Sequence, residues 1–432
     1  MTRSFVFLST LALLIGCGDD NQPSGPQDVS MQTFNVALAG AFIPFVNERG
    51  VVLPDAIAAS DADLICLEEV WPQADKEAMR DAAADTFAHT AFFEDNLDTP
   101  IDDPTDQTGQ VPPTPTTVPC PDIAAGDATI ADQMNAAVDC VRDNCSTIPG
   151  DDEGRTTSTD CAAAECVGAV GPLLLGDEQQ QRCYACMVTQ LPTSTFGEIR
   201  DSCTTVVNQD LAFEGQNGVM ILSRYPLKNE KEWVLPGTWN RRTILSATVE
   251  LPNGAELDAY CNHLTPIFND FTFPYTGQYG DGMTGAAGWE AEQALQAQKL
   301  IDYVASNSGD RPAVILGDFN AGHAFPAQDI AAEGSDTLTL LESAFPEALT
   351  ADYVPQCTFC SSNPVTNPTA DPEQPSSWID HILLSNLPSS AVMSSSRVFD
   401  QDVVPVEGGD MVPLSDHFGM QAVVTVPAPS AP

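Results

Sequence analysis

The chain has 432 residues, 43% of them hydrophobic, which is enough for one large domain with an inserted segment. It carries 61 acidic residues against 16 lysines and arginines, giving a net charge of −45 at pH 7. Because nucleic-acid backbones are bound mainly through lysine and arginine, this balance argues against a non-specific duplex-binding protein. The simpler explanation of the acidity is solubility, for example in a saline habitat.

The first residues have the features of a targeting signal. Arg3 precedes an apolar run over residues 5–15, which is too short to span a membrane and is typical of a secretory signal. The run closes in Leu-Ile-Gly-Cys, ending at Cys17, which resembles the lipobox of bacterial lipoproteins. We therefore predict a signal peptide over 1–16, a lipid on Cys17 that anchors the exported protein to the membrane of the cell envelope, and a polar tether over 17–30. The alternative is a plain secretory signal with an incidental cysteine.

Two short apolar segments then end in polar side chains. Residues 31–38 predict a first strand containing Asn35, whose amide must be satisfied if it is buried. Residues 62–71 predict a second strand ending in Glu68 and Glu69. A carboxylate buried at a strand end is costly unless it is paired or coordinates a metal. Two solvated acids are the alternative interpretation.

From about residue 96 the character of the sequence changes. Residues 99–119 are rich in proline, threonine and aspartate and predict an irregular linker. Alanine-rich stretches with helix-forming content follow. They contain eight cysteines, Cys120, Cys140, Cys145, Cys161, Cys166, Cys183, Cys186 and Cys203. We predict that residues 96–212 comprise this linker and a helical module with about four disulfides, inserted into the main domain. Zinc binding is the less favoured alternative because the segment contains no histidine.

The main domain is expected to resume over residues 213–426, before a disordered tail at 427–432. Alternating segments on either side of an Asn-Gly turn predict a hairpin, and the second of them leads into His263. The glycine- and aromatic-rich stretch 266–289 predicts a long loop that faces a substrate, and 290–306 predicts a helix.

The stretch 313–322 combines a strand with potential chemistry. Val314 to Leu316 predict a buried strand, and Asp318 and Asn320 stand at its end. Residues two apart on an extended chain point to the same side, so both side chains could face one site. On this stretch alone, a site for a metal-bound phosphate and a simple Asx-rich turn are equally compatible with the sequence.

Three further features follow in the last part of the chain. Asp380 lies in a predicted core strand over 376–385, and Asp416 and His417 precede the last strand. Between residue 320 and the strand at 376–385, the sequence predicts a loose, irregular region. A Cys-x2-Cys pair ending at Cys360 predicts a small local disulfide.

Seven short pieces of the sequence, in the order given below, resemble the endonuclease/exonuclease/phosphatase superfamily, which includes DNase I and the bacterial sphingomyelinases. The pieces are Thr33-Phe34-Asn35-Val36, Leu67-Glu68-Glu69-Val70, Ile221-Leu222-Ser223-Arg224-Tyr225-Pro226, Asn262-His263-Leu264, Gly317-Asp318-Phe319-Asn320, Ile379-Asp380-His381-Ile382 and Ser415-Asp416-His417. The resemblance covers residues 31–95 and about 213–426. It implies a four-layer α/β sandwich of two packed mixed sheets flanked by helices.

The resemblance also implies a metal site. Glu69 would be the principal ligand of Mg²⁺, with Mn²⁺ possible, because hard cations prefer carboxylate oxygens. Asn35 would lie beside the ion, and Asp416 would flank the metal or the neighbouring histidine. One departure concerns this site: Glu68 stands where the family often has Gln or Asn, which we expect to add negative charge near the ion.

The remaining residues would act on a phosphoester. Asp318 would position or deprotonate the attacking water, and Asn320 and His263 would donate to the phosphate. His417 would be the general acid/base, oriented by Asp380.

A second departure from the family pattern indicates which branch of the family this chain resembles. Apurinic endonucleases carry an acid where this chain has Ala37, and together with His263 this favours the DNase I-like and sphingomyelinase-like branches. The sequence therefore predicts an exported Mg²⁺-dependent phosphoesterase that uses in-line attack by an activated water. Its substrate is left open among a nucleic acid, a phospholipid and a small phosphate ester, and no obligate protein partner is expected. The alternative is a non-catalytic binding protein at the cell surface, built on the same fold.

Overall fold

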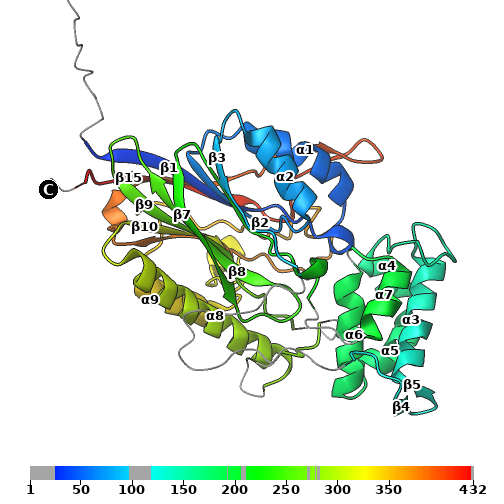
Figure 1. Ribbon diagram of the computed structural model, residues 1–432. Helices are drawn as coiled ribbons and strands as arrows, with labels where there is room; N and C mark the ends of the chain where they lie inside the picture. Colours follow the sequence, from blue (N-terminus) through cyan, green and yellow to red (C-terminus); the bar gives the residue numbers. More distant parts are fainter. Residues whose placement is uncertain are drawn as a thin grey trace, which may run out of the picture.

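The structure is a computed structural model that describes residues 25–96, 118–191, 193–205, 211–269, 273–277, 279 and 283–429. Two mixed β-sheets pack face to face, and helices cover both outer faces (Figure 1). The predicted four-layer α/β sandwich with a cysteine-rich helical insertion is confirmed. The predicted signal peptide, residues 1–16, and Cys17 lie outside the described residues.

The first sheet has six strands and the second has five. In spatial order the first contains β12 (Val392–Val398), β15 (Gly419–Val426), β1 (Gln27–Asn35), β2 (Leu64–Glu68), β6 (Met220–Ser223) and β3 (His89–Ala91). The second contains β11 (Asp380–Ser385), β10 (Ala313–Asp318), β9 (Glu256–His263), β8 (Arg242–Glu250) and β7 (Leu227–Leu235). Two short hairpins pair β4 (Ala124–Ala125) with β5 (Ala128–Thr129) and β13 (Val404–Pro405) with β14 (Met411–Val412).

Side-chain alternation explains how each sheet buries both faces. The outer layers are α1 (Val46–Ala58) and α2 (Gln73–Ala83) on one side and α8 (Gly285–Ser308) and α9 (Ser335–Ala344) on the other. In β2, Cys66 lies in the core between the sheets, whereas Ile65 and Leu67 lie in the core under α1 and α2. In β10, Ile315 packs under α8 and α9 in the same way. Strands buried on both faces are therefore apolar almost throughout, and a polar residue at their ends is exceptional.

Three boundaries differ from the sequence predictions. The tether predicted to reach residue 30 ends earlier, because Gln27 to Thr33 pair antiparallel with β15. The loop predicted over 266–289 is shorter, since α8 already begins at Gly285. The region after Asn320, which looked loose, contains α9, whose Leu338 and Leu341 pack against the second sheet.

The insertion is helical and cross-linked as predicted. It contains α3 (Ile130–Asn144), α4 (Thr159–Glu165), α5 (Val167–Leu174), α6 (Glu178–Gln190) and α7 (Phe196–Cys203). Capping boxes at Thr129, Asp177 and Thr195 define where α3, α6 and α7 begin. Four disulfides cross-link the insertion: Cys120–Cys183, Cys140–Cys166, Cys145–Cys161 and Cys186–Cys203. These sulfurs are consumed in bonds to one another, so the zinc alternative does not hold.

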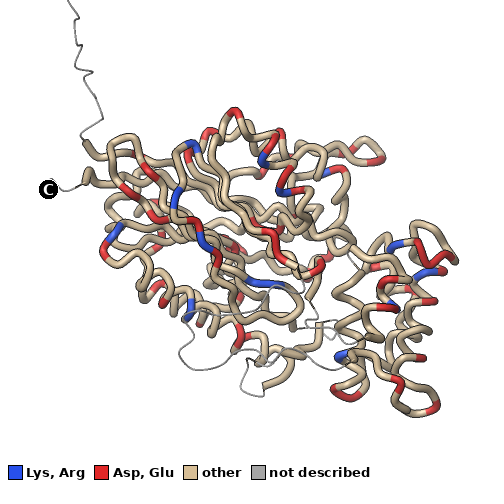
Figure 2. The backbone as a smooth tube through the Cα atoms, in the orientation of Figure 1, with Lys and Arg blue, Asp and Glu red and all other residues tan. Residues whose placement is uncertain are grey.

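The insertion packs against the main domain beside the sandwich (Figure 1). Its apolar core is continuous with Trp239, Tyr275 and Trp289 of the main domain. Acidic residues are spread over both parts, whereas lysines and arginines are few (Figure 2). Among the described residues, no helix is long and apolar enough to cross a membrane.

Two further disulfides lie in the main domain. Cys357–Cys360 is the local bridge that the sequence predicted. Cys66–Cys261 was not predicted, and it joins β2 of one sheet to β9 of the other across 195 residues of sequence.

Candidate active site

Strand register brings the predicted site residues to one edge of the sandwich. In the first sheet Asn35 pairs with Glu68 across the parallel strands β1 and β2. In the second sheet Asp318 is flanked by His263 on the parallel strand β9 and by Asp380 on the antiparallel strand β11. Alternation also points these side chains inward, because Asp318 continues the inward series of Val314 and Leu316. The carboxyl ends of β1, β2, β9 and β10 thus deliver polar groups to a single place between the sheets.

Left-handed backbone conformations sharpen the turns at this edge. Ala37, Glu69 and Asn320, none of them glycine, have φ values of 50°, 58° and 48°. Such conformations are uncommon outside glycine and persist where the surrounding structure fixes them. Arg49 supplies part of that fixation, since its guanidinium donates to the carbonyl oxygens of Val36, Ala37 and Leu414. It thereby ties the segment after β1 to the segment that carries Asp416.

His417 and Asp380 form a buried pair. His417 Nδ1 lies 2.9 Å from Asp380 Oδ2, so Nδ1 carries a proton and donates it to the carboxylate. Burial alone would lower the pKa of His417, but the carboxylates of Asp380, Asp318 and Asp416 outweigh it and raise the pKa well above its ordinary value. The other ring nitrogen, Nε2, lies 3.8 Å from Asp318 Oδ2. His417 is therefore a charged imidazolium whose free N–H faces the site.

Asp318 lies at the centre of the cluster. Asn35 Nδ2 donates to Asp318 Oδ2 at 2.9 Å, and the backbone N–H of Asn320 donates to Oδ1 at 2.8 Å. Burial and the nearby charge of Asp380 raise the pKa of Asp318 to about 7, against the opposing effects of His417 and the two hydrogen bonds. A carboxylate with a pKa near neutrality can accept a proton from water at working pH.

Glu69 and Asp416 form the second acidic part of the site. Asn35 Nδ2 also donates to Glu69 Oε1 at 3.2 Å, and Trp71 Nε1 donates to Oε2 at 3.4 Å. Burial, followed by repulsion from Asp416, raises the pKa of Glu69. The site thus gathers buried carboxylates whose mutual repulsion is only partly offset by His417.

The donor set fits a hard divalent cation. Carboxylate and amide oxygens are the ligands that Mg²⁺ prefers, and a cation beside Glu69 and Asp416 would relieve the repulsion that helps to raise the pKa of Glu69. In addition, one ligand atom from each of Asp318, Asp380 and His417 lies within 4.8 Å of the others. Because His417 Nδ1 is already engaged by Asp380, the Glu69 side of the cluster is the better place for the ion.

His263 and Asn320 also lie beside Asp318, and His263 Nε2 is 3.5 Å from Asp318 Oδ2 and 4.0 Å from Glu69 Oε1. Asn320 Nδ2 donates to the carbonyl of Leu264 at 2.9 Å and also lies 3.0 Å from His263 Nε2. Burial, together with the charges of Arg242 and His417, lowers the pKa of His263 well below its ordinary value. His263 is therefore neutral, and its Nε2 accepts from Asn320. Donation from Nε2 to a phosphate, the role predicted for His263, requires a second proton on this ring.

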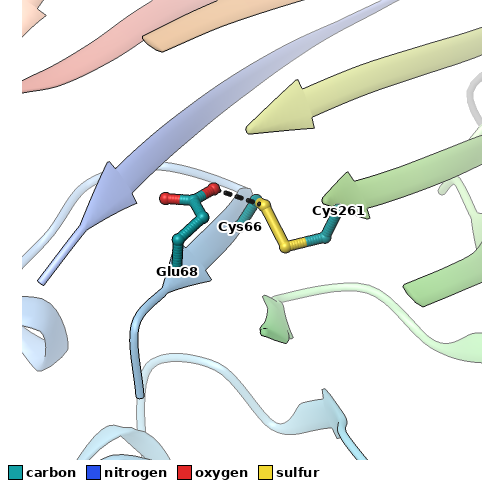
Figure 3. A group of neighbouring side chains, drawn as sticks. All are labelled: Cys66, Glu68 and Cys261. Carbon is teal, nitrogen blue, oxygen red and sulfur yellow. Dashed lines mark hydrogen bonds between the residues drawn. A yellow bond between two sulfur atoms is a disulfide. The ribbon is translucent and has the colours of Figure 1, made fainter. Parts of the chain in front are cut away.

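Glu68 was expected to add negative charge near the ion, but its position in the structure does not support this. Glu68 follows Cys66 on the inward face of β2, so it points between the sheets and touches the Cys66–Cys261 disulfide (Figure 3). Thr33 Oγ1 donates to Glu68 Oε1 at 2.6 Å, and Cys66 Sγ lies 2.7 Å from the same oxygen. A disulfide sulfur carries no hydrogen, so only a proton on the carboxyl can be shared across that contact. Burial raises the pKa of Glu68 well above its ordinary value. The carboxyl is therefore neutral, and Glu68 adds no charge beside the ion. Because Cys66 and Cys261 are joined in a disulfide, these two cysteines and Glu68 do not form a metal site.

Arg242 is a site residue that the sequence did not reveal. It begins β8, its side chain is 5% exposed, and its Nε and Nη1 atoms have no hydrogen-bond partner among the described residues. Its guanidinium lies 5.8 Å from the centre of the Trp71 ring. Burial lowers the pKa of Arg242 to about 10, so the side chain is still charged at neutral pH. A buried guanidinium with unused donors is suited to a phosphate. The only signal in the sequence is the Arg-Arg pair of residues 241 and 242, in a chain with 16 basic residues.

Comparison with known proteins agrees with this geometry. The model of the Endonuclease/Exonuclease/phosphatase family matches residues 33–417, which span the site from β1 to His417. The chain belongs to this family. No curated protein sequence matches the chain.

Several solved structures are similar to this chain at low identity. Sphingomyelinase C from Streptomyces griseocarneus has a TM-score of 0.49 at 12% identity, with 92% of this chain and 99% of the other covered. An endonuclease/exonuclease/phosphatase from Beutenbergia cavernae gives 0.43 at 16%, covering 94% and 73%. A Staphylococcus aureus beta toxin mutant with bound magnesium ions gives 0.47 at 13%, covering 92% and 100%. These likenesses do not identify a substrate for this chain.

Proposed function

We propose that this protein is a metal-dependent phosphoesterase that hydrolyses a phosphodiester or phosphate ester by in-line attack of an activated water. Mg²⁺ is the proposed ion, with Mn²⁺ possible, and Glu69 would hold it together with Asn35 and Asp416. When bound, such an ion would stabilise negative charge on the phosphate and the leaving oxygen. Membership of the family and the oxygen-rich donor set support this proposal.

One observation carries the proposal. A carboxylate with a pKa of about 7, Asp318, lies 3.8 Å from Nε2 of an imidazolium, His417, that Asp380 orients. Hydrolysis of a phosphoester needs a base for the attacking water and an acid for the leaving oxygen, and this arrangement supplies both within one buried cluster.

The chain's own residues can account for the proton movements. Asp318 takes a proton from water as the new bond from the water oxygen to phosphorus forms. The bond from phosphorus to the ester oxygen breaks, and His417 gives its Nε2 proton to that oxygen, which leaves as an alcohol. Arg242, whose Nε and Nη1 donors are unused, would hold the non-bridging phosphate oxygens, and its charge favours the additional negative charge of the transition state. Asn320 would donate to these oxygens only after releasing Leu264 or His263.

We further propose that the protein is exported and anchored to the bacterial cell envelope. The hydrophobic run over 5–15 and the lipobox-like ending at Cys17 support this proposal. Twelve cysteines joined in six disulfides also suit an oxidising compartment.

A turnover assay tests the proposed function. Purified protein should hydrolyse bis-p-nitrophenyl phosphate, or at least one member of a panel of DNA, RNA, sphingomyelin, phosphatidylinositol and small phosphate esters, when Mg²⁺ is present. EDTA should abolish the activity, and added Mg²⁺ should restore it. No metal-dependent turnover on any member of the panel would favour the alternative, a non-catalytic binding protein on the same fold.

A further inference from the structure

A cavity of about 650 Å³ joins the candidate active site to the insertion. At one end it is lined by Glu69, His263, Asn320 and His417. At the other it is lined by apolar side chains of α3, α5 and α6 and of the residue after α6: Val141, Val170, Leu174, Met187, Val188 and Leu191. The reacting groups thus open directly onto a space whose far wall the insertion builds.

The main domain supplies the facing wall, which is also apolar. It includes Trp71, Phe213 and Phe268. The rings of Trp71 and Phe213 stack with their centroids 4.6 Å apart, so this wall is preformed and rigid. A cavity of this size with an apolar lining and a few convergent polar groups is typical of a site for an organic ligand.

The helix α5 carries the apolar lining out to the surface. Residues 166–176 contain no charged side chain, in a chain whose net charge is −45. Val167, at the start of α5, lines the cavity and is nevertheless 67% exposed, so it lies at the cavity mouth. Leu175, directly after the helix, is 71% exposed. The mouth of the cavity therefore presents apolar side chains to whatever approaches it.

The charges that line the cavity suit one phosphate and not a polyanion. Arg242 is the only lysine or arginine among the described residues that line it, whereas Glu69, Asp160 and Asp416 are acidic. A nucleic-acid strand extending from the site would meet no further cation along this wall. A molecule with one phosphate and a long uncharged part would instead match both ends of the cavity.

We propose that the substrate is a phosphodiester of an amphiphile, whose phosphate lies at Arg242 and His417 and whose aliphatic tail occupies the cavity against α5 and α6. This inference rests on the proposed phosphoesterase function and adds the class of substrate to it. It also gives the disulfide-linked insertion a role, because the insertion forms the wall against which the tail packs.

Binding of n-alkyl phosphonates tests the tail site without turnover. The full-length chain is titrated calorimetrically in the presence of Mg²⁺ with butyl, hexyl, octyl and decyl phosphonate, all below their micelle concentrations. Each added methylene buried in the cavity should lower Kd about two- to fourfold. Val170→Asp should remove this dependence on chain length, whereas Val51→Asp, at a 79% exposed site on α1 outside the cavity lining, should keep it.

The possible outcomes separate this proposal from the proposed function. Equal Kd values from butyl to decyl phosphonate, with hydrolysis of bis-p-nitrophenyl phosphate intact, would overturn the tail site and leave the phosphoesterase standing. A chain-length dependence that persists in Val170→Asp would also overturn it, provided that the melting temperature and the disulfides of the variant match those of the wild type. If that variant misfolds, Val167→Asp, at the exposed mouth, serves instead. Absence of all phosphoester hydrolysis would contradict the proposed function itself.

Discussion

At the scale of single residues, the protonation state of each buried side chain determines what the site can do. Asp318 has a pKa of about 7, His417 is held as an imidazolium, and Glu68 and His263 are neutral because they are buried. Groups with different protonation thus stand within one small volume, which is how a site obtains an acid and a base at the same pH.

The neutral carboxyl of Glu68 gives a pH-dependent prediction. The pKa of Glu68 is raised in the folded protein, so its contribution to stability is full below the pKa of the unfolded chain and is lost as pH rises. Glu68→Gln keeps the acceptor for Thr33 and removes this loss. We expect the variant to match the wild type near pH 4 and to gain about 1.4 kcal/mol in free energy of unfolding per pH unit above that, until Glu68 itself ionises. Urea unfolding from pH 4 to 8 measures it.

The control for this experiment is Glu77→Gln, at an exposed glutamate on α2. It should leave the pH dependence of the wild type unchanged. A Glu68→Gln curve parallel to the wild type at every pH would show that Glu68 is ionised in the folded protein, and that it does place a charge beside the metal site.

Arg242 gives a second prediction at this scale. Because hydrogen bonds to charged groups contribute about 1.5–3 kcal/mol, Arg242→Gln should lower kcat/KM roughly 10- to 150-fold. Its buried Nε and Nη1 atoms have no protein partner among the described residues, so the melting temperature should not fall. Steady-state kinetics and calorimetry measure the two effects, with surface Arg80→Gln as control. A large loss of stability with unchanged kinetics would make Arg242 a structural residue.

The sequence predicted site residues well where a motif marks them and poorly where only packing does. Asn35, Asp318 and His417 stand in short motifs, and the structure places them together. Arg242 has no motif, and its significance comes from burial without a partner, which depends on the tertiary structure. The direction of Glu68 could have been predicted, since it follows Cys66 on the same face of a strand.

At the scale of secondary-structure elements, the site is positioned by the ends of strands and by a disulfide. Five strands bring side chains to one edge, and the Cys66–Cys261 disulfide joins the two sheets directly behind it. The sequence predicted the strands from apolar runs, but it could not supply a pairing between residues 195 apart. It also missed α9, a ten-residue helix whose N-cap, Gly334, makes no side-chain capping hydrogen bond that would mark the start of the helix.

The two main-domain disulfides should differ in their effect on stability. Constraint of the unfolded chain grows with loop length, and the bridges span 195 and 3 residues of sequence. Cys66→Ser with Cys261→Ser should therefore lower the free energy of unfolding by about 2–5 kcal/mol. The matched double variant Cys357→Ser with Cys360→Ser should lose clearly less. Denaturant titrations compare them, and equal losses would contradict this account of the inter-sheet bridge.

At the scale of the whole molecule, the chain combines an acidic family domain with an apolar cavity formed by its insertion. Motifs outlined the two parts of the family domain, but the continuity between the insertion core and Trp239, Tyr275 and Trp289 required the folded structure. This packing could not be predicted from the sequence, because the insertion and these aromatic residues are far apart along the chain and come into contact only in the folded protein.

Export and anchoring give a prediction for the whole chain. Expressed in a bacterium, the protein should fractionate with membranes, and its mature form should begin at a lipid-modified Cys17. Cys17→Ser should move it to the soluble fraction, because the lipid would be lost. Mass spectrometry of the mature N terminus provides the measurement, and an unmodified Cys17 in the mature chain would contradict the lipid anchor.

Hydrolysis of bis-p-nitrophenyl phosphate tests the central claim most directly, when wild type, His417→Ala and Asp318→Ala are compared with and without Mg²⁺. The wild type should turn over only with the metal, and each variant should lose about 10²- to 10⁴-fold in kcat, the usual contribution of a general acid or base. Matching melting temperatures would show that the variants are folded. Metal-independent hydrolysis, or variants as active as the wild type, would contradict the assignment of this site.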